Sequence, residues 1–230
     1  MTKEEIIVTI NDLWKSYKLD KIHHDVLKGV NLEVQKGKFV LIMGPSGSGK
    51  TTLLNIIGLI DAYDKGSYHL GSIDTTSLTP KEMRRIRLEK IGFIFQTFNL
   101  VASLTAQQNV ELPLSLKKVP QDEQHTRSEE LLKLVGLYHR LKNKPRQLSS
   151  GEQNRVAIAR SLIIEPTIIV ADEPTGNLDR KNTETIMELL TKVQKQKNVT
   201  LICTSHNIKL SEYADITYKL EDGIIKEGSY

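Results

Sequence analysis

Positions 44–52 carry the residue types that bind a nucleoside triphosphate. They read Gly-Pro-Ser-Gly-Ser-Gly-Lys-Thr-Thr and match the phosphate-loop pattern G-x-x-x-x-G-K-[ST] at every fixed position. Glycines let the backbone curl tightly, so that successive N–H groups point at an anion. The lysine can then reach the β- and γ-phosphates as a point charge, and the first threonine hydroxyl can ligate Mg²⁺. The predicted nucleotide-binding residues are Gly44, Pro45, Ser46, Gly47, Ser48, Gly49, Lys50, Thr51 and Thr52, with Thr51 also a predicted metal ligand.

The residues on either side of this loop fit the elements that must position it. The apolar run at 39–43 is typical of a short buried strand, and 51–59 has the pattern of a helix. A helix that begins beneath the phosphates adds the positive end of its dipole to the site. The sequence therefore predicts a strand, a phosphate loop and a helix in that order.

Two acids follow a second apolar run, at 168–171. An α/β sheet places ligand chemistry at the carboxyl ends of its strands. Asp172 is the predicted magnesium ligand, directly or through water, and Glu173 is the predicted general base for an attacking water. An acidic loop without function is the alternative, and the phosphate loop in the same chain disfavours it.

Two further polar residues follow apolar runs. Gln96 comes after 91–95, where its amide can reach the metal or the water, and His206 comes after 201–205, where it can bond the γ-phosphate. Each alone is more often a structural polar residue. Their repeated placement after apolar strands makes both catalytic candidates, together with Lys50 and Glu173.

The segment 148–160 predicts a second anion-binding device. Ser149 is a good N-cap residue, and the residues after it have helical spacing, so a second helix N-terminus is available to an anion. A chain with one phosphate loop has no obvious need for a second such device.

Composition limits the class of protein. The chain has 230 residues, of which 39% are hydrophobic and 26% charged, as in a globular protein with one domain. The net charge of +4 comes from 32 basic and 28 acidic residues that are interspersed, so we expect a mixed solvated surface and no nucleic-acid partner.

The single cysteine, Cys203, lies in an apolar run and is expected to be buried. We find no signal peptide, and the longest apolar stretch, 53–60, is too short to cross a membrane.

The order of the patterns predicts an α/β core interrupted by helices. Short apolar runs with an amphipathic segment between them favour a parallel sheet covered by helices. Strands are expected at 6–10, 27–34, 66–73, 167–171 and 199–204, and helices at 104–116, 121–137, 151–164 and 181–195.

These segments together resemble the ATPase subunit of ABC transporters over nearly the whole chain. The phosphate loop, Gln96, the signature-like segment at 148–160, Asp172 with Glu173, the loop at 177–179 and His206 all occur in the family's order. Tyr17 matches the aromatic residue that stacks on adenine in that family. A half-buried strand tyrosine is the alternative reading of Tyr17.

The resemblance implies a fold and a mode of assembly. We expect one nucleotide-binding domain over 1–230: a P-loop NTPase core with a mostly parallel sheet, an N-terminal antiparallel β subdomain and a helical subdomain inserted at about 97–162. Two such subunits, identical or different, pack head to tail in the family with ATP and Mg²⁺ between them. Ser149 and Gly151 would then bond the γ-phosphate of ATP held by the partner. The family's usual Leu-Ser-Gly-Gly-Gln is altered here at Ser150, whose side chain lies where the backbone approaches phosphate.

The segments 92–96, 109–114 and 171–179 resemble the branch of lipoprotein-release, macrolide-efflux and antimicrobial-peptide-resistance ATPases, the LolD/MacB-like branch. This implies a peripheral subunit on the cytoplasmic face of the cell membrane that hydrolyses ATP for a permease, typically one with four spans and an external domain. A cell-division ATPase similar to FtsE is the alternative, and the longer segment 18–25 favours the export branch.

Other classes with this loop fit less well. ABC-type translation factors carry two nucleotide domains in one chain. The DNA-repair ATPases of the superfamily carry a long coiled coil after the glutamine, whereas only residues 97–147 separate Gln96 from Leu148 here. The cargo is not encoded in any motif of this chain.

Overall fold

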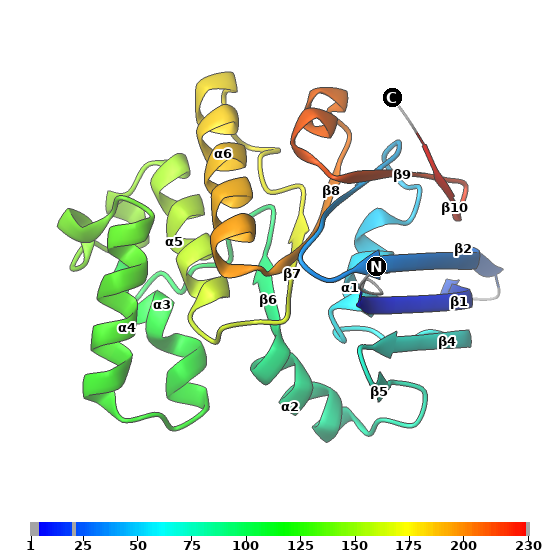
Figure 1. Cartoon of the computed structure of the whole chain (residues 1–230), viewed down its shortest axis with the longest axis horizontal. Coiled ribbons are helices and arrows are strands. Elements are labelled where there is room, and N and C mark those ends of the chain that lie inside the picture. The colour runs from blue at the N-terminus through cyan, green and yellow to red at the C-terminus, as the bar shows by residue number, and fades with distance from the viewer. Residues whose placement is uncertain (1–4, 20–21, 229–230) are drawn as a thin grey trace.

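The computed structural model describes residues 5–19 and 22–228, and it contains two β-sheets (Figure 1). The first sheet is antiparallel, with strand order β2-β1-β4-β5. Its strands are β1 (Ile6–Leu19), β2 (Ile22–Gln35), β4 (Lys65–Leu70) and β5 (Ile73–Asp74). This is the N-terminal antiparallel β subdomain that the family resemblance implies.

The second sheet is mostly parallel, with strand order β10-β9-β3-β8-β7-β6. Its strands are β3 (Phe39–Met43), β6 (Ile91–Ile94), β7 (Ile168–Asp172), β8 (Thr200–Ser205), β9 (Ile216–Glu221) and β10 (Ile224–Glu227). Only β10 runs antiparallel, beside β9. The carboxyl ends of β3, β6, β7 and β8 therefore lie at one edge of the sheet, where an α/β fold binds its ligand.

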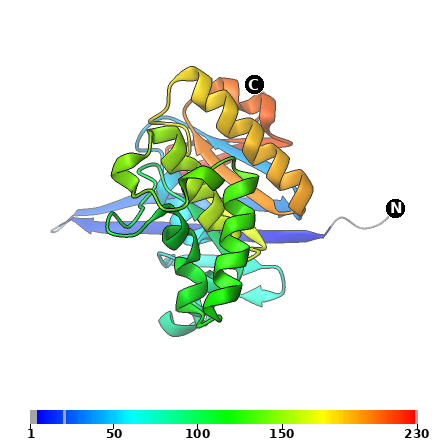
Figure 2. The same cartoon turned by 90° about the vertical axis from the view of Figure 1, so that its left-hand side faces the viewer.

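Helices α3 to α6 cover one side of the parallel sheet, and α1 lies on the other side with the antiparallel sheet (Figure 1). The helices are α1 (Lys50–Ile57), α2 (Pro80–Lys90), α3 (Ala106–Leu116), α4 (Gln121–Leu134), α5 (Ser150–Leu162) and α6 (Arg180–Lys197), with short 3-10 turns at Tyr138–Arg140, Pro145–Gln147 and Ile208–Tyr213. Figure 1 shows α3 to α6 on one side of the parallel sheet and the antiparallel sheet with α1 on the other, and Figure 2 shows the same helices in front of the strands. The parallel sheet is thus the middle layer.

Two hydrophobic clusters meet at this middle layer. Along β3, Phe39, Leu41 and Met43 pack with helices α3 to α6, whereas Val40 and Ile42 pack with β1, β2 and α1. All five residues are buried. A parallel strand covered on both faces needs such a continuous apolar run, because its side chains alternate between the two layers.

The expected fold class is confirmed, with local differences. The single strand expected at 66–73 is wrong, because Gly71, with a φ of 56°, turns the chain and separates β4 from β5. Strands β1 and β2 are longer than expected, because β-bulges allow the two strands to remain paired through polar stretches. The helix expected to reach Leu137 ends at Leu134, just before Gly136, which has a φ of 72°.

Sequence patterns missed α2, β9 and β10. Helix α2 buries only Ile86, so it has no apolar stripe. Its start is nevertheless encoded, since Thr79 and Glu82 form a capping box around Pro80. The assignment of 97–162 to an inserted helical subdomain stays a prediction, since α3, α4 and α5 share one cluster with the sheet.

A buried carboxylate joins α3 to α4. Glu111 is 5% exposed, and its Oε1 accepts a hydrogen bond from Ser128 Oγ (2.8 Å) and lies 2.6 Å from His125 Nδ1. The hydrogen bond and the charge of Glu111 raise the pKa of His125, and Asp122 and Glu129 add to the effect, while burial opposes it slightly. A protonated His125 therefore stabilises the contact between the two helices.

We expect His125→Gln to lower the melting temperature more at about pH 5.5 than at about pH 8.5, on either side of the usual histidine pKa of about 6.5. The folded-state pKa of His125 is raised, so its contribution is complete below the unfolded-state pKa and is lost as the pH rises through the folded-state pKa. Differential scanning fluorimetry at the two pH values measures this.

His69→Gln is the matched control, because His69 is similarly exposed and lies 4.0 Å from the carboxylate of Asp74 within the antiparallel sheet. An equal loss at both pH values for His125→Gln would show that the helices are not joined by this ion pair.

Candidate nucleotide-binding site

The loop between β3 and α1 is shaped by two glycines. A Cβ on Gly44 would lie 2.1 Å from the carbonyl oxygen of Leu220 on β9, so only glycine allows this approach. Gly49, with a φ of 103°, is the N-cap of α1, and no side chain caps this helix. The first N–H groups of α1 are therefore available to a ligand, as the phosphate-loop motif predicts.

Polar groups inside the loop fit an anion. The Ser48 Oγ is buried and has no hydrogen-bond partner among the described residues. Lys50 Nζ donates to the carbonyl oxygens of Gly44 and Pro45, each at 2.9 Å, so its ammonium group is held over the loop. An unpartnered buried hydroxyl, a lysine and a helix N-terminus are the donors that phosphate oxygens require.

Two oxygen ligands for a cation meet at the end of β7. Thr51 Oγ1 donates to Asp172 Oδ2 (2.9 Å), and Thr204 Oγ1 donates to Asp172 Oδ1 (2.7 Å). A hydroxyl beside a carboxylate is a donor set that suits Mg²⁺, which takes one or two protein oxygens and completes its shell with water and phosphate. Within residues 5–19 and 22–228 we find no cluster of three or more His, Cys, Asp or Glu that would hold a metal alone. The site thus fits a magnesium ion that arrives with its nucleotide.

Glu173 lies between the side chains of a lysine and a histidine. Its Oε1 is 3.9 Å from Lys50 Nζ, and its Oε2 is 3.0 Å from His206 Nδ1. Its backbone is in the left-handed region, with a φ of 43°, and its N–H donates to Thr204 Oγ1 (3.1 Å). Such a conformation is costly for a residue with a side chain and is often kept at functional positions.

These groups share one cavity. It has a volume of about 690 Å³ and is lined by Val26, Ser46, Gly47, Gly49, Lys50, Thr51, Thr52, Gln96, Glu173 and His206. The structure therefore brings together the strand-end residues that the sequence singles out. Asp172 is joined to this cavity by the hydrogen bond that it accepts from Thr51, one of the lining residues. The carbonyl oxygen of Gln96, in the loop after β6, accepts a hydrogen bond from Asn177 (3.0 Å), which fixes that loop beside Glu173.

Sequence reasoning missed two residues of this site. Val26 on β2 lines the cavity, although nothing in its local pattern distinguishes it from a structural valine. Thr204 holds both the Asp172 carboxylate and the Glu173 backbone. Its signal is a hydroxyl residue directly after the apolar residues 201–203, on a strand with six buried residues.

Tyr17 and the residues of the second helix N-terminus do not line the cavity. Tyr17, on β1, is 38% exposed and is not one of the residues that line it. Ser149 is the N-cap of α5, as predicted: its Oγ accepts from the N–H of Glu152 (3.3 Å), and its own N–H donates to the Glu152 carboxylate (2.8 Å). Gly151 packs against Asn182, where a Cβ would lie 2.9 Å from Oδ1. Neither Ser149 nor Gly151 faces the phosphate loop of its own chain in this cavity.

Helix α5 is nevertheless tied to the catalytic loop. The Asn154 side chain is buried and donates to the carbonyl oxygen of Pro174, directly after Glu173. Arg140 Nε lies 3.1 Å from Glu152 and holds the first turn of α5 from the other side. A buried hydrogen bond therefore joins α5 to the loop that follows Glu173.

A phosphate loop after a buried parallel strand, with a carboxylate at the end of another strand of the same sheet, defines the class of P-loop nucleotide-binding proteins. The model of the ABC transporter family matches residues 27–176, and the chain belongs to this family.

Relatives place the chain more closely. A dimeric structure described as a post-hydrolysis state of the ATP-binding cassette MJ0796, bound to ADP and Pi, has a TM-score of 0.90 and 42% identity, covering 97% of this chain and 98% of that one. MJ0796 is a protein of Methanocaldococcus jannaschii. The lipoprotein-releasing ATP-binding protein LolD of Geobacter metallireducens is 42% identical over 94% of this chain and 96% of its own length. The macrolide export ATP-binding/permease protein MacB of Bdellovibrio bacteriovorus is 44% identical over 96% of this chain and 33% of its own length.

The predicted LolD/MacB-like branch is thus confirmed, and the chain is an ATP-binding, ATP-hydrolysing subunit of ABC transport systems. No helix among residues 5–19 and 22–228 has both the length and the apolar character needed to span a bilayer.

Proposed function

We propose that this ATPase closes as a dimer, identical or mixed, around ATP and so drives a membrane permease that exports a lipoprotein, a macrolide or an antimicrobial peptide. The observation that carries the hydrolytic part is the position of Glu173 between Lys50 and His206 in the cavity of the phosphate loop. The similarity to LolD and MacB supports the export part. None of the relatives named above favours the FtsE-like alternative.

The residues of one chain have distinct tasks in this proposal. The backbone N–H groups of the loop at 44–49, Ser48 and Lys50 bind the phosphates, and Tyr17 stacks on adenine. Thr51 and Asp172, with Gln96, hold Mg²⁺, which when bound neutralises charge on the phosphate oxygens. Glu173 accepts the proton of the attacking water, and His206 orients Glu173 and bonds the γ-phosphate.

The N-terminus of α5 is the feature that supports a site shared between two copies of the chain. Ser149 and Gly151 are suited to an anion but are not in the cavity of their own phosphate loop. A second copy packed head to tail would bring them to the γ-phosphate. The relative MJ0796 is itself described as dimeric. Closure then places ATP between the phosphate loop of one protomer and helix α5 of its partner. Within each protomer, the hydrogen bond from Asn154 to Pro174 couples the position of α5 to that of Glu173.

A groove beside α2 and α5 is the proposed contact with the permease. Its volume is about 490 Å³, and its lining residues are Ile60, Arg84, Arg87, Leu88, Ile91, Gly92, Phe93, Phe95, Asn99, Pro113, Leu116, Arg160, Ser161 and Ile164. Ile60 and Leu116 are 45% and 66% exposed. Exposed apolar side chains gathered in a hollow are typical of a protein contact.

The charge of this groove indicates the kind of segment that binds there. Arg87 donates to the carbonyl oxygen of Leu59 and Arg160 to those of Phe98 and Asn99, all at 2.6 Å. Among the described residues none that lines the groove is acidic. An amphipathic permease helix with a carboxylate would therefore fit it. Such docking keeps the subunit peripheral, on the cytoplasmic face of the membrane, against a permease expected to have four spans and an external domain.

Glu173→Gln should bind ATP, lower the rate of hydrolysis about 10²- to 10⁴-fold and accumulate as a dimer, because the general base is lost while the phosphate and metal groups remain. Phosphate release and size-exclusion chromatography with ATP and Mg²⁺ measure both effects. Glu165→Gln is the control, since Glu165 also has a left-handed backbone, with a φ of 52°, but is exposed and outside the cavity. A Glu173→Gln protein that stays monomeric and hydrolyses ATP at the wild-type rate would exclude this role.

Mixing two inactive variants, Lys50→Ala and Ser149→Arg, should restore part of the ATPase activity. If Ser149 acts on the partner's nucleotide, a mixed dimer has one site with both lesions and one site with neither. The steady-state ATPase rate of the mixture measures this, with subunit exchange verified by cross-linking. Activity that remains at the level of the single variants, despite exchange, would mean that Ser149 and Lys50 serve one site within one chain.

Ile60→Glu should prevent the membrane permease from co-purifying while the isolated subunit keeps its basal ATPase activity. The substitution puts a carboxylate into the apolar wall of the groove and occupies the place proposed for the permease helix. Ile224→Glu is a close control, because Ile224 is 46% exposed, on β10, outside the groove. Equal loss of the permease with both variants, or with neither, would exclude this groove as the docking surface.

A further inference from the structure

We propose that Asp61 and Lys15 are positioning residues for Tyr17: they fix its ring so that one ring face is presented to the nucleotide base. The proposal rests on the adenine contact of Tyr17 given under the proposed function. It concerns residues that no motif of the sequence indicates, because Asp61 lies 44 positions after Tyr17 in the chain.

A carboxylate holds the phenol at its tip. Tyr17 OH donates to Asp61 Oδ2 (2.7 Å). The other carboxylate oxygen, Oδ1, accepts from Lys15 Nζ (3.1 Å) and from the N–H of Ala62 (2.8 Å). Lys15 also donates to the carbonyl oxygen of Ala62 (2.6 Å). The carboxylate that accepts from the tyrosine is thus itself held by two further hydrogen bonds, from Lys15 and from the N–H of Ala62, so it stays in place if the ring turns.

The loop that carries Asp61 is bound to both α1 and β1. The N–H groups of Ile60 and Asp61 both donate to the carbonyl oxygen of Asn55, at 2.8 and 3.2 Å. The carboxylate of Asp64 accepts from the N–H (2.6 Å) and the hydroxyl (2.8 Å) of Ser16, the residue before Tyr17. Position 61 is therefore fixed relative to the phosphate-loop helix and relative to the strand of Tyr17.

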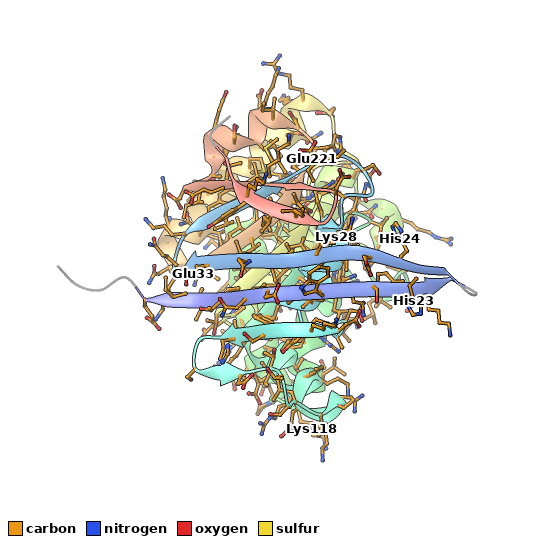
Figure 3. All side chains as sticks on the ribbon, turned by 90° about the vertical axis from the view of Figure 1, so that its right-hand side faces the viewer. His23, His24, Lys28, Glu33, Lys118 and Glu221 are labelled. Carbon is orange, nitrogen blue, oxygen red and sulfur yellow. The ribbon has the colours of Figure 1, made fainter. Side chains whose placement is uncertain are left out.

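Lys15 also contacts the ring itself. Its Nζ lies over the Tyr17 ring, 4.9 Å from the centroid, and its side chain is 10% exposed. A cation held over one face of an aromatic ring occupies that face. The opposite face is the one left for a base. On the neighbouring strand, the residue in register with Tyr17 is His24, which Figure 3 labels near the hairpin end of β2.

The charges keep this arrangement constant around neutral pH. Burial raises the pKa of Tyr17, and its hydrogen bond to Asp61 raises it further, so the phenol stays a donor. Burial alone would raise the pKa of Asp61, but the hydrogen bonds from Tyr17 and Lys15 outweigh it and lower that pKa, so the carboxylate stays an acceptor. The side chain of Thr52 acts in the opposite direction and lowers the pKa of Tyr17, but burial and Asp61 outweigh it.

A fixed ring binds a base better than a free one. Tyr17 is on a strand surface, and an exposed tyrosine there can adopt more than one rotamer. Each rotamer that misses the base lowers the population able to bind, and preorganisation removes that cost. Base stacking is worth about 1–3 kcal/mol in comparable sites, so the ring's position matters for affinity and not for the chemical step.

The test measures dissociation constants for ATP and for inorganic tripolyphosphate, which has no base. Tyr17→Phe and Asp61→Ala should each weaken ATP binding about threefold to tenfold, the value of one lost hydrogen bond, and leave tripolyphosphate binding unchanged. The double variant should be no weaker than either single one, because both remove the same bond. Asp61→Asn, which keeps an acceptor oxygen for the phenol, should bind ATP more tightly than Asp61→Ala.

Asp74→Ala is the control, because Asp74 is an exposed carboxylate of the same antiparallel sheet and bonds the N–H of Thr76 rather than Tyr17. It should leave ATP affinity unchanged. Additive losses from Tyr17→Phe and Asp61→Ala, or an equal loss of tripolyphosphate binding, would overturn the positioning role, as would an Asp74→Ala loss as large as that of Asp61→Ala.

Tyr17→Ala separates this proposal from the one on which it rests. If Tyr17→Ala weakens ATP binding while Tyr17→Phe and Asp61→Ala do not, the stacking role stands and the positioning role is wrong. If Tyr17→Ala leaves ATP binding unchanged, the adenine contact is wrong and the positioning role fails with it, although the catalytic assignments at Glu173 and Lys50 are untouched.

Discussion

The parallel pairing of β3, β8 and β7 is the constraint on which the rest of this structure depends. In register, Met43 lies beside Ser205 and Thr204 beside Asp172, so the three strands end at the same edge of the sheet. The carboxyl ends of parallel strands lie at one edge of the sheet, and the loops that follow these strands therefore converge. A shift of one residue would exchange the two faces of a strand, which both clusters of the core prevent.

Convergence alone does not orient the side chains, and hydrogen bonds from two threonines complete the task. Thr204 binds the carboxylate of Asp172 and the N–H of Glu173, while Thr51 binds the same carboxylate from the phosphate-loop helix. Glu173 is thereby kept in a left-handed conformation between Lys50 and His206. The strain at one residue is balanced by bonds from a strand that is buried along its whole length.

Much of this could be predicted from the sequence, because buried parallel strands and phosphate loops have strong local patterns. The strand at 39–43, the helices α3 to α6 and the polar residues after each strand follow from apolar periodicity and position. Helix α2 could not be found by periodicity, since it buries only Ile86. The bulged strands β1 and β2 extend beyond the apolar residues from which they could be predicted. The contacts of Tyr17 with Asp61 and of Asn154 with Pro174 join distant positions, so only the fold shows them.

The most direct test asks whether the phosphate loop of one chain meets helix α5 of another. A protein with Ser46→Cys, mixed with one carrying Ser150→Cys, provides one thiol on each side of the proposed contact, and the native Cys203 is buried. A two-copy site predicts a disulfide-linked dimer under mild oxidation with Mg²⁺ and a slowly hydrolysed ATP analogue, and little without nucleotide. No cross-link with the analogue, in protein shown to bind it, would contradict a site shared between two chains.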